Sequence, residues 1–296
     1  MKKIAGSMLA LFALLAVGMS GIATGQDDPP TGMMPPKVLA ITREFTKPGK
    51  SGTAHEKTES AFVQAVTRAK WPTHYLAVES LSGKARALFL TGYDSFEAWE
   101  KDTLASQKNT TLSADLDRAW AADGELLTET DNAVLAFREE YSLRPQVDIA
   151  HMRYFEISLY QVRHGHDKDW EEIVKMVTAA YEKIPGVHWA TYACVYGFPD
   201  TTYVIFNPIK SAEEIDKSFA QGKEFEAEMG EDRMRKLNEL SAAAIESSQT
   251  NLFAFNPRMS YPADEWIKVD PEFWKPKGAP AAAAAKKPAE KPADKQ

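Results

Sequence analysis

The chain has 296 residues, 44% hydrophobic and 26% charged, a composition typical of a folded globular protein with one large domain or two ordinary ones. Its 42 acidic residues outnumber its 35 basic residues and the formal net charge is −7, so we expect no basic surface for a phosphate backbone and no nucleic-acid partner. Its single cysteine, Cys194, excludes an intrachain disulfide, so stability has to come from core packing.

The N-terminal segment has the pattern of an export signal. Two lysines precede an apolar stretch at residues 9–17, and small residues follow, with Ala23 and Gly25 at the −3 and −1 positions of a cleavage site. We therefore expect a cleaved signal peptide over residues 1–25, a linker over 26–35, and a periplasmic or secreted protein. A retained N-terminal anchor is the alternative. No later segment is long and apolar enough to predict a membrane span.

Four blocks of sequence recur in the same order, at offsets of 114 to 118 residues. In one of them, PGVHWATY (residues 185–192) matches the earlier WPTHYLAV (residues 71–78). A nearly constant offset over several blocks indicates a duplicated unit of about 110 residues. We expect the first unit to span residues 36–145 and the second to span residues 146–262.

The first unit reads as strand, helix, two strands, a long helical region and a last strand. Apolar residues at helical spacing indicate the first helix, which Pro72 ends because proline lacks an N–H group and clashes with the preceding turn. The predicted strands are residues 38–45, 73–81, 86–91 and 133–141, and the long helical region starts at Ser95.

The second unit repeats this order. The predicted strands are residues 154–162, 187–196, 202–207 and 251–255, with a helix after the first strand that Pro185 ends. Ser211 and Glu214 predict a capping box at the start of the long helical region. The βαββαβ order, present twice, predicts an α+β fold of two tandem ferredoxin-like units whose antiparallel sheets form an α/β barrel.

The first strand of the second unit alternates between apolar and polar residues. We expect its apolar set to face the helices and its polar set to face the barrel interior. The apolar set is Phe155, Ile157 and Leu159, and the polar set is Tyr154, Glu156, Ser158 and Tyr160.

Two segments follow the second unit. Residues 263–274 are a C-terminal extension without a predicted role. Residues 275–296 are rich in Ala, Lys and Pro and have no apolar face, so we expect them to be disordered.

This pattern resembles the dimeric α/β-barrel superfamily. The resemblance covers about residues 36–262 and depends on the tandem units, on VRHGHDKDWEEIVK after the first strand of the second unit, and on PGVHWATY. The NIPSNAP-like and antibiotic-biosynthesis-monooxygenase-like branches are closest in pattern. The resemblance implies two four-stranded sheets packed face to face, helices outside and a ligand cleft between the sheets. It also leaves a homodimer open.

Candidate site residues follow from the polar face of the sheet and from the repeated histidines. For catalysis we consider His188, Glu156 and Tyr160, because an imidazole and a carboxylate in one cavity could form an acid–base pair. A histidine hydrogen-bonded to a neighbouring loop is the simpler alternative for His188. For ligand binding we expect His74, Glu44, Tyr154, Ser158, Trp189 and Tyr192.

We predict no metal site and no cofactor. The HGHDKD turn at residues 164–169 lacks the further converging ligands that a zinc site needs. Some relatives bind haem through a histidine on a late helix, and none of the six histidines falls in residues 95–128 or 211–248. Haem is therefore disfavoured, although another axial residue would leave it open.

Three functions remain. The main hypothesis is an exported protein that binds a small, partly apolar molecule between its two sheets. The alternative is a cofactor-independent monooxygenase-like or isomerase-like enzyme that acts on a small aromatic substrate. The second alternative is a structural or assembly protein of the cell envelope.

Overall fold

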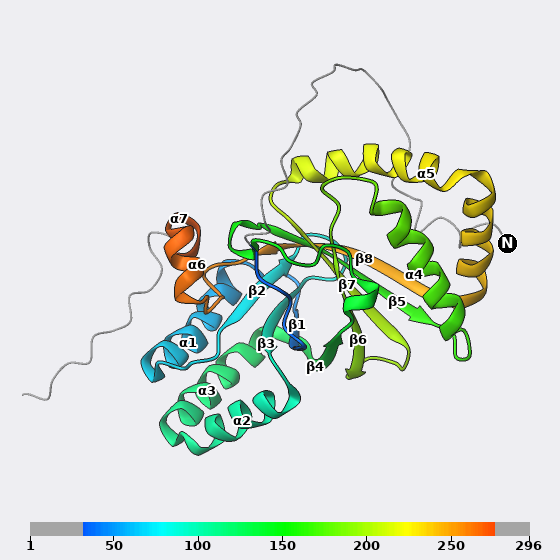
Figure 1. The fold of residues 1–296 in the computed structure, drawn as a ribbon. Coiled ribbons are helices and arrows are strands. Elements are labelled where there is room, and N and C mark those ends of the chain that lie inside the picture. Colours follow the sequence, from blue (N-terminus) through cyan, green and yellow to red (C-terminus); the bar gives the residue numbers. More distant parts are fainter. Residues whose placement is uncertain (1–31, 276–296) are drawn as a thin grey trace, which may run out of the picture.

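Eight antiparallel strands form a closed barrel in the computed structural model, which describes residues 32–275 (Figure 1). The predicted signal peptide and almost the whole predicted disordered tail lie outside the described residues and stay predictions. No helix among residues 32–275 has both the length and the apolar character to cross a bilayer.

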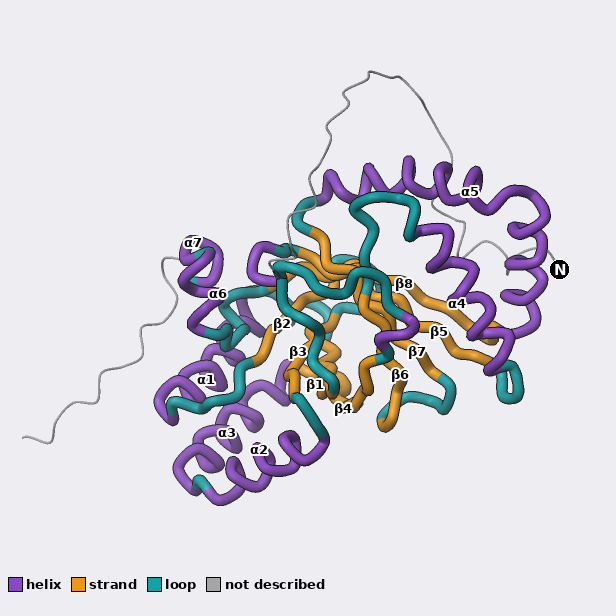
Figure 2. Tube along the Cα trace, in the orientation of Figure 1, coloured by secondary structure: helices purple, strands orange, loops and turns teal. Residues whose placement is uncertain are grey.

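The strands follow one another around the barrel in the order β1-β3-β2-β8-β5-β7-β6-β4 (Figure 2). Within the first half the order is β4-β1-β3-β2, and within the second half it is the matching β8-β5-β7-β6. The halves join where β2 pairs with β8 and where β4 pairs with β6. The strands are β1 (Val38–Thr46), β2 (Tyr75–Ser80), β3 (Arg86–Tyr93), β4 (Leu127–Phe137), β5 (Tyr154–Val162), β6 (Ala190–Tyr196), β7 (Thr202–Ile209) and β8 (Ile245–Phe255).

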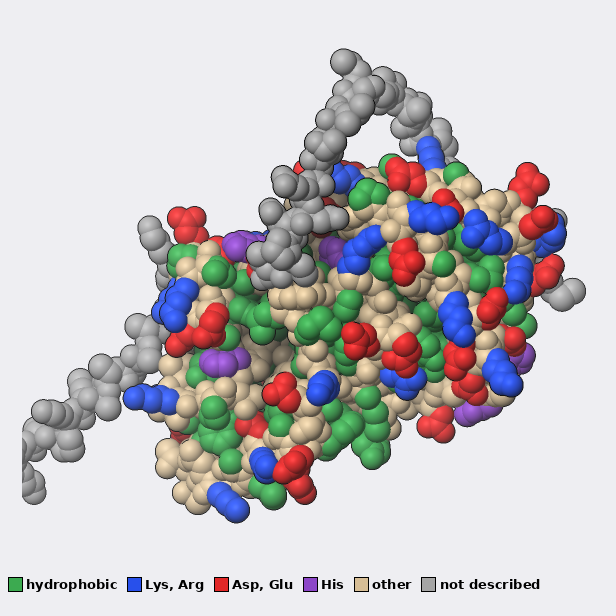
Figure 3. All heavy atoms as spheres, viewed as in Figure 1, with side chains coloured by type: hydrophobic (Ala, Val, Ile, Leu, Met, Phe, Trp, Pro, Cys, Tyr) green, Lys and Arg blue, Asp and Glu red, His purple; other side chains and the backbone are tan. Residues whose placement is uncertain are grey.

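Helices cover the outer surface of the barrel in two groups. Three of them flank the first half and two flank the second half, on opposite sides of the strands (Figure 1). The first group is α1 (Thr53–Ala69), α2 (Phe96–Lys108) and α3 (Thr110–Asp123), and the second is α4 (Asp167–Tyr181) and α5 (Ala212–Ala244). Acidic and basic side chains are mixed over the face shown in Figure 3.

Two details of the long helical regions differ from the prediction. The region that starts at Ser95 is split at Asn109, whose side chain accepts a hydrogen bond from the backbone N–H of Leu112 and so begins α3. Ser211 begins α5, but its hydroxyl makes no capping hydrogen bond. Instead, a carboxylate oxygen of Glu214 accepts a hydrogen bond from the backbone N–H of Lys210 at 3.1 Å.

The barrel interior is filled with apolar side chains from both halves. Phe155 and Ile157 of β5 lie in this core, where the ring of Phe155 contacts the rings of Phe206 and Phe255 at centroid distances of 5.5 and 4.8 Å. The expectation that these residues face the helices is therefore wrong. The strands turn one face to the barrel interior and the other outward, where helices cover part of the surface, and the larger apolar side chains occupy the interior.

The C-terminal extension packs against the barrel. It forms α6 (Asp264–Val269) and α7 (Pro271–Trp274), and Trp274 is only 3% exposed within the main core. The indole N–H of Trp274 donates a hydrogen bond to the backbone oxygen of Ala150 at 2.9 Å. The extension is thus part of the folded body.

Candidate functional site

A cavity of about 680 Å³ lies between the second half of the barrel and its helices. The outer faces of β5 and β7 form its floor, and α4, α5 and the loop that precedes β6 form its walls. Aromatic and aliphatic side chains supply much of the lining, among them Tyr160, Trp170, Ile173, Val177, Tyr181, Trp189, Ile205, Ile209 and Phe225. The volume suits a small molecule.

This cavity therefore does not lie in the expected cleft between the two sheets. The barrel interior is occupied by core side chains, whereas Glu156, Ser158 and Tyr160 point to the helix side and line the cavity. We predicted that the polar residues of this strand would lie near a ligand site in the barrel interior. Glu156, Ser158 and Tyr160 do line a cavity, but on the outer face of the sheet.

Glu156 is the carboxyl group on the cavity floor. Burial raises its pKa, and a hydrogen bond with Asn207 offsets part of that effect. Burial, followed by the charge of nearby Glu156, raises the pKa of Tyr160 to about 12. The phenol of Tyr160 thus stays protonated at neutral pH and can donate a hydrogen bond, while Glu156 can exchange a proton.

Two further polar atoms of the lining have no hydrogen-bond partner among the described residues. They are the indole nitrogen of Trp170 and the hydroxyl oxygen of Thr178, both from α4 and both buried. Both atoms are closed off from solvent, so they are unsatisfied groups in the cavity wall and do not by themselves mark a ligand contact.

His188 and Trp189 also line the cavity, but both are hydrogen-bonded to backbone oxygens. Nε2 of His188 lies 2.8 Å from the backbone oxygen of Pro208, and the indole N–H of Trp189 donates to the backbone oxygen of Tyr141 at 2.9 Å. A backbone oxygen can only accept, so Nε2 of His188 carries the proton in this contact. His188 and Glu156 both line the cavity, and an acid–base pair between them stays a prediction. The partner of Nε2 belongs to β7 and not to a neighbouring loop, so the simpler alternative for His188 stays a prediction as well.

The other predicted binding residues lie elsewhere. Tyr192 is buried, and its hydroxyl donates to the backbone oxygen of Pro36 at 3.0 Å. His74 stacks on Tyr261 at a centroid distance of 4.6 Å. Tyr154 pairs with neighbouring strands at one end of β5. Their roles in ligand binding stay predictions, and none of the three lines this cavity.

The lining does not fit haem as it stands. His188 is the single imidazole of the lining, and its Nε2 donates a hydrogen bond to the backbone oxygen of Pro208. The ring would have to rotate before Nε2 could bind an iron atom. Three carboxylates, Glu156, Glu214 and Glu226, accompany one cation, Lys217, where haem propionates would need positive partners. The prediction that the chain has no cofactor is not supported, and haem is left open.

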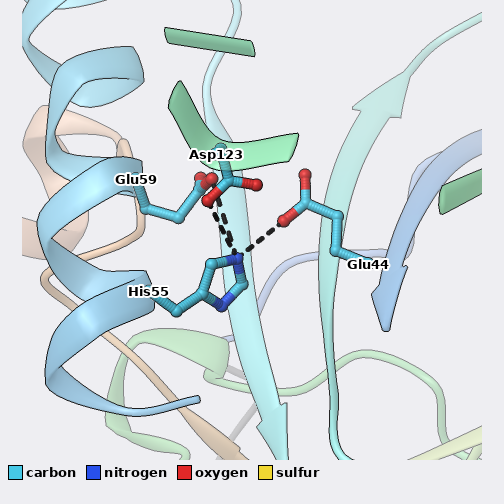
Figure 4. A group of neighbouring side chains, drawn as sticks. All are labelled: Glu44, His55, Glu59 and Asp123. Atoms are coloured by element: carbon cyan, nitrogen blue, oxygen red, sulfur yellow. Dashed lines mark hydrogen bonds and ion pairs between the residues drawn. The ribbon is translucent and has the colours of Figure 1, made fainter. Parts of the chain in front are cut away.

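A second polar site lies in the first half, on the same outer side of the sheet. Glu44 of β1, His55 and Glu59 of α1, and Asp123 at the end of α3 direct their side chains toward one another (Figure 4). All four are at most 2% exposed. Their ligand atoms lie within 4.8 Å of one another. The prediction of no metal site is not supported, because these four side chains are of metal-binding types.

The imidazole of His55 stands at the centre of this cluster. Its Nε2 lies 2.9 Å from Glu44 Oε2, 3.5 Å from Asp123 Oδ1 and 3.9 Å from Glu59 Oε1. Burial alone would lower the pKa of His55, but hydrogen bonding to Asp123 and Glu44 raises it to about 10. Burial raises the pKa of Glu44 and, more strongly, that of Glu59.

Sequence reasoning finds only part of this cluster. It identifies Glu44, but as a residue that binds a small molecule and not as a member of this cluster. His55 and Glu59 are separated by four positions, which places them on one face of a helix, and this local signal is present in the sequence. Asp123 follows 64 residues after Glu59, so only the fold brings it to the cluster.

Comparisons with known proteins agree with the fold. No family model and no curated protein matches the chain. Among solved structures, a candidate monooxygenase from Fusobacterium nucleatum subsp. nucleatum has a TM-score of 0.50 at 13% identity, covering 75% of this chain and 94% of that one. A mutant chlorite dismutase from Candidatus Nitrospira defluvii has a TM-score of 0.45 at 11% identity, with 82% and 99% covered.

At these identities the likeness shows the fold alone. The chain has the predicted α+β class, with a closed antiparallel barrel whose fold is similar to that of a ferredoxin-like α/β-barrel protein. The organisation as two tandem units stays a prediction. The NIPSNAP-like branch and the homodimer stay predictions.

Proposed function

We propose that the chain binds a small, partly apolar molecule in the cavity beside α4 and α5 and acts on it by proton transfer through Glu156. One observation carries this proposal. A half-buried carboxyl group with a raised pKa lies on the floor of a cavity of about 680 Å³ whose walls are largely aromatic and aliphatic. Perturbed titratable groups inside such cavities are typical of active sites.

Two cavity residues can take different roles in proton transfer, Glu156 as the base and Tyr160 as the hydrogen-bond donor. When ionised, Glu156 is a stronger base than an ordinary carboxylate because burial disfavours its charge. It could remove a proton from an acidic C–H or O–H group of a small aromatic substrate, while the Tyr160 hydroxyl donates a hydrogen bond to the developing oxyanion. A cofactor-independent monooxygenase-like or isomerase-like reaction would start with this step.

Binding without turnover is the second candidate. Nε2 of His188 donates to the backbone oxygen of Pro208 and Glu156 is hydrogen-bonded to Asn207, so both acid–base side chains already have partners in the protein. These contacts favour a binding protein in which Glu156 recognises a polar group of the ligand.

Three broader inferences accompany this proposal. We infer that the two halves descend from a duplicated unit, since their strand order matches and their sequence blocks recur at a nearly constant offset. We infer export because of the N-terminal signal pattern, and we place the chain near the monooxygenase-like branches of the superfamily.

The test is to identify the ligand and then to fill the cavity. The purified protein is analysed by absorbance and native mass spectrometry for a bound molecule, and aromatic acids and phenols are titrated while tryptophan fluorescence is recorded. Val177→Trp, on the cavity wall, should weaken binding at least about 10-fold because the larger ring occupies the ligand volume.

Val195→Trp is the matched control. Val195 lies on β6, is 41% exposed and is outside the cavity, so this variant should bind like the wild type. Equal binding by both variants, with both folded, would mean that the ligand site lies elsewhere. Glu156→Gln then separates the two candidates: an enzyme loses turnover but keeps much of its affinity, whereas a binding protein has no turnover to lose.

A further inference from the structure

The buried cluster of Glu44, His55, Glu59 and Asp123 has no role in the proposed chemistry of the cavity. It lies against the first half of the barrel, whereas the cavity lies against the second half. We propose that this cluster binds one divalent transition-metal ion, Mn²⁺, Fe²⁺ or Zn²⁺, independently of any ligand in the cavity.

The first argument is the convergence of three carboxylates on one nitrogen. A ring N–H can make one well-formed hydrogen bond, and Nε2 of His55 makes it with Glu44 at 2.9 Å. Asp123 and Glu59 approach the same nitrogen at the longer distances of 3.5 and 3.9 Å. Donor atoms of a tetrahedral site with bonds of about 2.1 Å lie about 3.4 Å apart. The ligand atoms of the cluster lie within 4.8 Å of one another, so side-chain shifts of about 1 Å would let them share an ion.

The second argument is that the cluster contains buried acceptors without partners. Oε1 of Glu59 and Oδ2 of Asp123 have no hydrogen bond to any described residue, and the two residues are 2% and 0% exposed. Asp123 is held in place through its other oxygen, which accepts a hydrogen bond from the Thr58 hydroxyl. A buried carboxylate oxygen left without a donor is costly unless a cation satisfies it.

The third argument is charge. Three carboxylates surround one imidazole in a buried site, so the cluster holds more acidic groups than one histidine can neutralise. A divalent ion supplies two positive charges to the same site. The Tyr75 hydroxyl is also buried without a hydrogen-bond partner among the described residues and lies near the charges of Glu59 and Glu44.

The ligand types narrow the choice of metal. An imidazole nitrogen suits zinc and iron, and carboxylate oxygens suit manganese, so one nitrogen with three carboxylates fits Mn²⁺, Fe²⁺ or Zn²⁺. Copper and nickel are less suited to a set with three carboxylates, and calcium and magnesium rarely use imidazole.

The experiment is a direct titration of the full chain. Chelator-treated protein is titrated with Mn²⁺ while the electron paramagnetic resonance signal of the free ion is recorded, and with Zn²⁺ or anaerobic Fe²⁺ in competition. We expect one ion per chain. Glu59→Gln should weaken binding at least about 10-fold, since it replaces a charged ligand with a neutral one of the same shape.

Glu156→Gln is the matched control, because Glu156 is a partly buried carboxylate on the outer face of β5 in the other half. It should leave metal binding unchanged. If Glu59→Gln fails to fold, Asp123→Asn provides the second variant. Wild-type protein that keeps its circular dichroism and binds none of the three metals would overturn the proposal. Binding of equal strength in the folded cluster variants would overturn it as well.

Discussion

At the scale of single residues, Glu156 differs from an ordinary surface carboxylate because the folded chain favours its protonated form. Burial raises its pKa from the ordinary value of 4.5, so the folded state binds this proton more tightly than the unfolded state does. Its contribution to stability is therefore fully present below the unfolded pKa. It falls as the pH rises toward the folded pKa, and above that pKa it is constant and unfavourable.

Glu156→Gln should remove this dependence. We expect the variant to gain stability relative to the wild type as the pH rises above the ordinary pKa of 4.5, because glutamine keeps the shape and has no charge to bury. Urea unfolding at several pH values measures the difference in free energy of unfolding. A difference that does not change with pH would show that Glu156 titrates as it does in the unfolded chain.

Glu156 also shows what the sequence could and could not predict about the site. Period-2 alternation identified Glu156, Ser158 and Tyr160 as one face of a strand, and all three line the cavity. The alternation could not say which face is inside, because Phe155 on the opposite face is equally covered. Only the relative placement of sheets and helices decides this.

At the scale of elements, α5 bends sharply at Gly230 (Figure 1). Gly230 has φ 67° and ψ 167°, a region that residues with a side chain essentially do not adopt. Phe225 and Met229 precede the bend and Leu237 follows it, yet all three pack in one cluster with Ile173 of α4. The bend thus lets both parts of α5 contact the same helix and close the cavity wall.

Gly230→Ala should destabilise the protein by about 1–3 kcal/mol. A Cβ atom at this position would meet nothing within 4 Å, so the cost comes from the backbone conformation and not from a collision. Chemical denaturation gives the free energy of unfolding.

Gly124→Ala is the control for this substitution. A Cβ atom at Gly124 would likewise meet nothing within 4 Å, but the φ of −54° and ψ of −24° at this residue are helical. Alanine there should be neutral or stabilise by about 0.4–1 kcal/mol, because it restricts the unfolded chain. Equal effects at both positions would contradict a conformational role for Gly230.

Element boundaries were predictable where the pattern was local. The predicted strand at residues 154–162 coincides with β5 (Tyr154–Val162). The last strand of the second unit was predicted to be too short, since β8 begins at Ile245. Its first half is polar and mostly exposed, so it lacked the apolar signal that marks a strand, and pairing with β5 orders it.

At the scale of the whole molecule, segments distant in sequence complete the barrel. The buried cluster of Glu44, His55, Glu59 and Asp123 brings together residues that are up to 79 positions apart in sequence. The main core contains side chains from strands of both halves and from α7. Local periodicity predicted the elements and their order, but the C-terminal extension had too few residues to show a pattern. The extension is attached to the barrel through Trp274, which packs in the main core and donates a hydrogen bond to the backbone oxygen of Ala150.

Trp274→Ala should cost about 3–5 kcal/mol of stability, as expected for a large aromatic side chain removed from a core. Trp274 is 3% exposed, contacts Phe255 of the barrel at a centroid distance of 6.4 Å, and donates a hydrogen bond to the backbone oxygen of Ala150. Val269→Ala, in the same extension but 55% exposed, should stay within about 0.5 kcal/mol of the wild type. Thermal and urea unfolding measure the stability of the two variants. Similar small losses of stability in both would mean that the extension contributes little to the folded core.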